Sequence, residues 1–120
     1  MLIKRKGMPA KSGKTTEVLQ KVVELLSENK SVLYVSNEYT YHNIYERIKD
    51  SVNQDMLNSF YFSDGDRLEA LISGIKNYDY MIGNLKDASI VVDIGKDVSD
   101  LKCDQDLYVY YQIPRENNSR

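Results

Sequence analysis

Short runs of β-forming residues alternate with segments of helical periodicity along this chain of 120 residues. Apolar residues recur at helical spacing from Lys14 to Glu28, and residues 31–38 then form an apolar, β-rich run that is typical of a buried strand. Alternation of this kind predicts an α/β fold with a largely parallel sheet and helices on both faces. The length favours a single domain over residues 1–120.

The same patterns predict the other elements. Helices are expected over 40–52 and 63–77, a polar loop at 53–55, and strands at 2–3, 60–62, 78–84, 89–95 and 106–113. Only about five residues separate 78–84 from 89–95, whereas a parallel crossover needs a dozen or more. Either one strand near the C-terminus is therefore antiparallel, or one of these two strand assignments is wrong. The tail, residues 115–120, is expected to be flexible.

The segment "KGMPAKSGKTTEVLQ", residues 6–20, contains the Gly-Lys-Thr that closes a phosphate-binding loop. The usual pattern, G-x-x-x-x-G-K-[ST], would place its first glycine at position 8, where this chain has Met8. A glycine stands one position earlier, at Gly7. Two readings follow: Met8 replaces the first glycine, or the loop is longer by one residue.

The chemistry of such a loop depends first on its backbone, because successive N–H groups and the N-terminus of the following helix attract an anion. Gly13 would allow close approach of the backbone, Lys14 would reach the phosphates, and the Thr15 hydroxyl would bind Mg²⁺. The residues expected to bind the nucleotide are Met8, Pro9, Ala10, Lys11, Ser12, Gly13, Lys14, Thr15 and Thr16. The alternative is a basic turn in which Ser12 or Thr15 is an ordinary helix cap.

The charge of the chain favours a small anionic ligand over a nucleic acid. The net charge is −2 and the pI is about 5.4, which is not typical of a protein that binds polyanions. All charged residues in the first 14 positions are basic: Lys4, Arg5, Lys6, Lys11 and Lys14. The tyrosine-rich stretches 39–45 and 108–111 could stack on bases, but strand alternation assigns part of the second stretch to the core. Direct binding of nucleic acid is thus the less supported reading.

The composition excludes some classes of protein. A single cysteine, Cys103, excludes an internal disulfide and a zinc site built on paired cysteines. The first residues run directly into charge without the apolar segment of a signal peptide, and no apolar run approaches the roughly 20 residues of a membrane helix. We therefore expect a cytoplasmic protein. His42, the single histidine, is expected to be a surface residue.

Residues 7–38, "GMPAKSGKTTEVLQKVVELLSENKSVLYVSNE", resemble the opening of RecA/DnaB-like P-loop ATPases. The resemblance covers residues 1–50 well and 57–84 loosely. It implies a RecA-like P-loop NTPase fold, which is a three-layer sandwich, with ATP and Mg²⁺ as cofactors. In that family, the glutamate after the second strand polarises the attacking water, and Glu38 is the matching position here. The alternative is that Glu38 is an ordinary solvated acid in a loop.

That family also has an aspartate at the end of a later apolar strand, where it holds the Mg²⁺ shell. By order along the chain this position falls on Asn84, or on Gly83, so the charge would be lost. Its rival is Asp93, which follows an apolar run and fits the pattern better, although an ordinary role at a strand end is the alternative. With Asn84 in that place, metal would be held less well and hydrolysis would be slow.

Two classes of function follow from the resemblance. The first is a small ATPase that hydrolyses ATP slowly, acts as a homo-oligomer and is linked to DNA replication or recombination. The second is a degenerate interaction module that contacts a helicase, a recombinase or a loader of either. Gly13, Lys14, Thr15 and Glu38 favour the first, whereas Met8, Asn84 and the short chain favour the second.

The resemblance leaves a lesser alternative for the function and suggests the kind of genome that encodes the chain. Nucleoside kinases of the thymidine kinase group resemble the opening stretch too, but they usually add a zinc-binding lobe with several cysteines. The short chain is in keeping with a minimal or decayed member of the ATPase family, of phage or mobile-element type.

Overall fold

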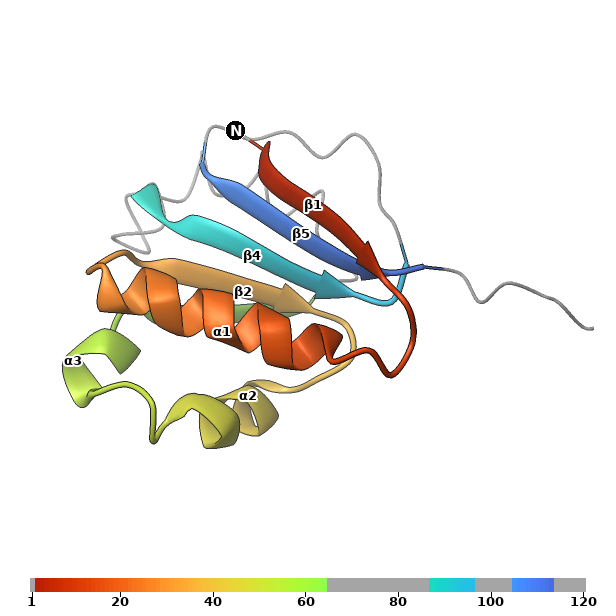
Figure 1. Cartoon of the computed structure of the whole chain (residues 1–120). Coiled ribbons are helices and arrows are strands. Elements are labelled where there is room, and N and C mark those ends of the chain that lie inside the picture. The colour runs from red at the N-terminus through yellow and green to blue at the C-terminus, as the bar shows by residue number, and fades with distance from the viewer. Residues whose placement is uncertain (1, 65–86, 97–104, 114–120) are drawn as a thin grey trace, which may run out of the picture.

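The computed structural model describes residues 2–64, 87–96 and 105–113, which form an α/β arrangement around one sheet (Figure 1). Its strands are β1 (Leu2–Met8), β2 (Val32–Ser36), β3 (Phe60–Asp64), β4 (Ser89–Ile94) and β5 (Leu107–Gln112). They pair in the order β1-β5-β4-β2-β3, and every pairing is parallel. All five carboxyl ends therefore lie along one edge of the sheet, where open α/β sheets bind ligands. This arrangement is compatible with a Rossmann-like or P-loop-like sandwich.

The described helices lie on one face of the sheet (Figure 1). They are α1 (Lys14–Ser27), α2 (Tyr41–Ile48) and α3 (Gln54–Leu57). The buried apolar residues of α1 are Val18, Leu19, Val22, Leu25 and Leu26. Their spacing is that of one helical stripe, and they share a core cluster with Tyr34 of β2 and Tyr110 of β5. The sequence predicted α1 correctly to within one residue of its end.

The opposite face of the sheet carries a second cluster of buried side chains. Its members are Leu33, Val35, Ala88, Ile90, Val92, Ile94, Leu107 and Val109. Because neighbouring side chains of a strand point to opposite faces, β2, β4 and β5 are apolar on both, as in parallel sheets covered on two sides. The helix predicted over 63–77 lies outside the described residues from position 65 onward. Ser63 and Asp64, the residues expected to cap its start, belong to β3.

The first strand is longer than the sequence predicted. A minimal strand was expected at Leu2–Ile3, because Lys4, Arg5 and Lys6 do not suit a central strand. β1 instead continues through these residues to Met8. Among the described strands it is at the sheet edge and pairs with β5. At an edge, long charged side chains can reach solvent, so the strand tolerates them.

Two further predictions need correction. The polar stretch 53–55 was expected to be a loop, but Asn53 accepts a hydrogen bond from the Met56 backbone N–H and caps the short helix α3. The antiparallel strand expected near the C-terminus is not found among the described strands, since β4 runs parallel to both neighbours. The other strand in that expectation, 78–84, lies outside the described residues. Residues 115–120 and Cys103 lie outside them too.

Candidate functional site

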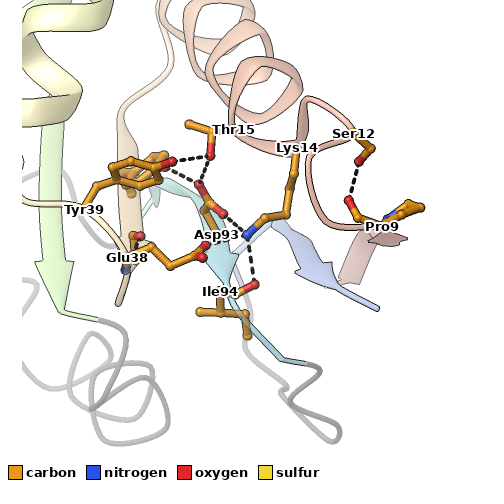
Figure 2. A network of polar contacts seen from close by, with 10 residues as sticks. Pro9, Ser12, Lys14, Thr15, Glu38, Tyr39, Asp93 and Ile94 are labelled. Atoms are coloured by element: carbon orange, nitrogen blue, oxygen red, sulfur yellow. Dashed lines mark hydrogen bonds and ion pairs between the residues drawn. The ribbon is translucent and has the colours of Figure 1, made fainter. Parts of the chain in front are cut away.

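Three segments meet at the carboxyl edge of the sheet (Figure 2). Residues 9–13 follow β1 and lead into α1, Glu38 follows β2 by two residues, and Asp93 lies at the end of β4. β2 and β4 are neighbours with Ser36 opposite Asp93, so the two carboxylates come from adjacent strand ends. The sheet topology thus brings together Lys14, which was expected to contact phosphates, Glu38, which was expected to contact water, and Asp93, which was expected to contact Mg²⁺.

The structure explains the displaced glycine. Gly7 lies inside β1, where a Cβ atom would be 2.8 Å from Tyr111 Cζ and 2.9 Å from Ile113 Cγ1. A side chain at position 7 would therefore have to displace Tyr111 of β5 or Ile113, which follows β5. Met8 is the last residue of β1, is buried, and its carbonyl accepts a hydrogen bond of 2.9 Å from the Ile113 N–H. The loop between β1 and α1 accordingly contains one glycine, Gly13.

The loop backbone turns sharply at two residues. Lys11 has φ 60° and Gly13 has φ 86°, and both values lie in the left-handed region. The Ser12 hydroxyl donates a hydrogen bond of 2.6 Å to the Pro9 carbonyl, which closes the loop on itself. Gly13 is the N-cap of α1, and no side chain caps this end. The reading of Ser12 or Thr15 as an ordinary cap is therefore wrong, because the N-cap position of α1 is Gly13 and makes no side-chain cap hydrogen bond.

Lys14 is the centre of the network in Figure 2. Its Nζ donates hydrogen bonds of 2.6 Å to Glu38 Oε1, 2.6 Å to Asp93 Oδ1 and 3.0 Å to the Ile94 carbonyl. The side chain is 9% exposed. Burial by itself would lower the pKa of Lys14, but the hydrogen bonds to Asp93 and Glu38 outweigh it, and the pKa is raised. The ammonium therefore stays charged, and its three protons are all engaged.

Asp93 is fully buried, with 0% of its side chain exposed. Besides Lys14, it accepts a hydrogen bond of 2.7 Å from Tyr34 OH and a long one of 3.4 Å from Thr15 Oγ1. Burial, together with the negative charge of Asp93, raises the pKa of Tyr34, so that its hydroxyl remains a donor. Thr15 also contacts Tyr39 OH at 3.2 Å. One carboxylate is thus oriented by three side chains from two elements.

Glu38 lies at the mouth of the site. Its side chain is 34% exposed, and its backbone N–H donates a 3.0 Å hydrogen bond to Ser36 Oγ, which turns the chain after β2. This turn directs the carboxylate toward Lys14. Glu38, Asp93 and Lys14 together carry one excess negative charge. A carboxylate that is partly exposed and held by a lysine is in a suitable place to contact a bound water.

Not every predicted residue joins this network. Pro9, Ala10 and Lys11 are exposed in the loop, and Thr16 faces a groove between α1 and α2 instead of the carboxylates. Asn84, the rival of Asp93, lies outside the described residues. Among the described residues there is no group of three or more His, Cys, Asp or Glu side chains that could hold a metal. His42 is exposed, as predicted.

Sequence reasoning missed two tyrosines of the site, Tyr34 and Tyr39. Tyr34 had a signal, because a buried strand such as β2 rarely carries a hydroxyl without a hydrogen-bond partner. Tyr39 had none beyond its place next to Glu38.

Comparisons of the chain with protein-family models, with curated proteins and with solved structures found no match. Within the described residues, no helix is long and apolar enough to cross a membrane.

Proposed function

We propose that the loop 9–13 and the first turn of α1 bind the phosphates of a nucleotide, ATP, together with Mg²⁺, within a RecA-like P-loop domain. One observation carries this proposal: Lys14 lies between two carboxylates that are 24 and 79 residues away along the chain. A basic turn before a helix needs no buried partner for its lysine. A phosphate loop needs its lysine, a metal carboxylate and a carboxylate for water at the same strand ends.

The residues present fit the chemistry of such a site. Lys14 would exchange its carboxylate partners for the β- and γ-phosphates, and the uncapped N-terminus of α1 would face the same anion. Thr15 and Asp93 would then hold Mg²⁺, which would neutralise charge on the phosphates. Glu38 would orient and polarise the attacking water. Mg²⁺ in nucleotide sites is commonly held by one or two protein oxygens plus phosphates, so Thr15 and Asp93 form a sufficient pair.

A second candidate is an interaction module that binds nucleotide without turnover. It is favoured by the departure from the usual motif: Met8, at the end of β1, stands in place of the first glycine, and the loop 9–13 has Gly13 as its single glycine. In this candidate, nucleotide binding would order a surface for a partner of helicase or recombinase type, or for a second copy of this chain. The link to replication or recombination rests on the resemblance, as does the lesser nucleoside-kinase alternative.

The test is a calorimetric titration of the protein with Mg-ATP and with Mg-GTP. Lys14→Ala removes a charged hydrogen-bond donor, so we expect affinity to fall by about tenfold to a hundredfold. Lys30→Ala is the control, because this exposed lysine pairs with Glu28 on the surface, and it should bind as the wild type does. No saturable binding at millimolar nucleotide would contradict the proposal.

Release of phosphate from ATP then separates the two candidates. Turnover by the wild-type protein supports the ATPase. Saturable binding without turnover supports the interaction module.

A further inference from the structure

A groove of about 370 Å³ runs between α1 and α2, outside the carboxylate network. Its floor is aliphatic, formed by Leu19, Val23 and Ile48, and its rim is polar, with Thr16, Gln20 and Arg47. The volume lies at the small end of the range for ligand sites, about 300–1,000 Å³, and mixed apolar and polar lining is typical of them. The groove is therefore large enough for one small organic group.

The lining suits a flat ring with apolar faces and polar edges. Aliphatic side chains contact ring faces without requiring hydrogen bonds, and the Gln20 amide can both donate to and accept from a ring edge. Arg47 extends over the ring of Tyr39, with its guanidinium carbon 5.7 Å from the ring centroid. A guanidinium placed over an aromatic ring is attracted to the ring and can contact a further planar group.

The groove is continuous with the phosphate loop. Thr16 directly follows the Gly-Lys-Thr and lines the groove, so the groove begins at the first turn of α1. From Thr16 to Val23 the helix extends by about 10 Å at 1.5 Å per residue. Tyr39 joins the two regions, because its hydroxyl lies 3.2 Å from Thr15 Oγ1 and its ring supports Arg47. A ligand whose phosphates contact Lys14 would have its remaining part next to this groove.

We propose that the groove binds the purine base and ribose of the nucleotide whose phosphates the loop holds. This inference rests on the proposed function and extends it to the part of the ligand that the loop does not reach. A purine fits better than a pyrimidine, because two fused rings bury more apolar area on the aliphatic floor.

The test compares Mg-ATP with Mg-tripolyphosphate, which carries phosphates and no nucleoside. Gln20→Trp fills the groove from an exposed position of α1 and should weaken Mg-ATP by about tenfold or more while leaving tripolyphosphate unchanged. Glu24→Trp is the matched control, since Glu24 is exposed one turn further along α1 and does not line the groove. Circular dichroism of both variants checks that the helix content is kept.

The outcomes are distinguishable from a failure of the proposed function. If tripolyphosphate binds the wild type as tightly as Mg-ATP, or if Gln20→Trp leaves Mg-ATP unchanged, the groove inference is overturned and the phosphate site stands. If neither ligand binds, the proposed function itself fails. Mg-CTP and Mg-UTP should bind about tenfold more weakly than Mg-ATP, and equal affinity for all of them would overturn the purine preference.

Discussion

A fully buried carboxylate is tolerated in a folded protein when donors satisfy it. Asp93 has three such donors, and they differ in what they contribute. Lys14 supplies the opposite charge, Tyr34 supplies a short hydrogen bond from inside β2, and Thr15 contacts the same oxygen from α1. Of the three donors, Tyr34 is the one that is not proposed to contact a ligand. Its contribution to stability can therefore be measured separately from any binding.

We expect Tyr34→Phe to lower the free energy of unfolding by about 1.5–3 kcal/mol, the usual range for a hydrogen bond to a charged group. The reason is that Asp93 Oδ2 loses its shortest donor in a site that water cannot fill easily. Urea unfolding measures the change. Tyr61→Phe is the control, because this tyrosine is half-buried on the other face of the sheet and its hydroxyl makes no hydrogen bond within the described residues. Equal effects of the two substitutions would contradict the role of Tyr34.

At the residue scale, the sequence predicted Lys14, Thr15, Glu38 and Asp93 of the site and missed two tyrosines. Lys14 and Thr15 follow from the loop motif, whereas Glu38 and Asp93, with Asn84 as the rival of Asp93, were named through the resemblance to RecA/DnaB-like ATPases. Tyr34 and Tyr39 could not be found in this way, because a tyrosine in or after a strand is usually a packing residue. The sequence left open whether Gly7 belongs to a longer loop, and the contact that places it in β1 involves Tyr111, a residue far away along the chain.

At the scale of elements, Gly7 fixes how closely β1 can approach β5. We expect Gly7→Ala to lower the free energy of unfolding by about 1–3 kcal/mol, because the added methyl would overlap Tyr111 and Ile113. Urea unfolding again provides the measurement. Gly95→Ala is the matched control, since the nearest atom to its Cβ is Glu38 Oε2 at 3.9 Å, an ordinary contact distance. A change of less than 0.5 kcal/mol for Gly7→Ala, about the level of a neutral surface substitution, would show that β1 shifts freely.

The edge strand is also joined to α1 by an ion pair. Lys6 Nζ lies 2.9 Å from both carboxylate oxygens of Glu17, and Lys4 Nζ lies 3.7 Å from one of them. The hydrogen bond from Lys6 is the main cause that lowers the pKa of Glu17 below its ordinary value of 4.5. A lowered pKa in the folded state stabilises the fold above pH 4.5, and this contribution is lost as the pH falls through the lowered value.

Glu17→Gln should therefore be less stable than the wild type at neutral pH, by up to about 1 kcal/mol because the pair is solvent-accessible. The difference should shrink as the pH falls below 4.5, where wild-type Glu17 takes up its proton. Urea unfolding at pH 7 and pH 3 tests both statements. Asp50→Asn is the control, because Asp50 is an exposed acid two residues after the end of α2. A difference that is the same at both pH values would mean that Glu17 acts through packing and not through charge.

The elements themselves were predictable to different degrees. α1, β2, β4 and β5 have strong periodic or apolar runs, so their bounds follow from the sequence within about two residues. The length of β1 was underestimated because its charged residues are not typical of a central strand, whereas β1 lies at an edge of the described sheet. α3 was missed because one turn of helix has no periodicity to detect. The strand order could not be predicted, since pairing β1 with β5 depends on contacts between the two ends of the chain.

At the scale of the whole molecule, the strand order decides which groups meet. β5 lies between β1 and β4, so the loop after β1 must pass the end of β5 before Lys14 reaches Asp93. Neighbouring strands are about 4.8 Å apart, which makes this separation about 10 Å. The loop and the long side chain of Lys14 cover that distance together. Lys14 therefore connects β1, at the edge of the described sheet, to β4 at its centre.

The ion pair between Lys14 and Asp93 leads to a prediction about the order in which Mg²⁺ and ATP bind. With Lys14 2.6 Å from Asp93 Oδ1, a divalent cation at Asp93 would lie close to an ammonium and be repelled by it. Phosphates remove that obstacle, because they attract Lys14 and bring oxygen ligands of their own. We therefore expect Mg²⁺ alone to leave the thermal unfolding midpoint unchanged, ATP with a chelator to raise it slightly, and Mg-ATP to raise it by more than the sum.

Differential scanning fluorimetry or calorimetry with the three ligand conditions measures this coupling. At a ligand concentration about 100 times the dissociation constant, binding adds about 2.7 kcal/mol of stability, which is well within detection. Lys14→Met is the decisive variant, because it removes the ammonium and keeps much of the side-chain volume. In that variant Mg²⁺ should bind at Asp93 without nucleotide and raise the midpoint, whereas ATP should lose its effect. The prediction fails if Mg²⁺ alone raises the midpoint of the wild type as much as Mg-ATP does. Lys14 would then not control access to Asp93.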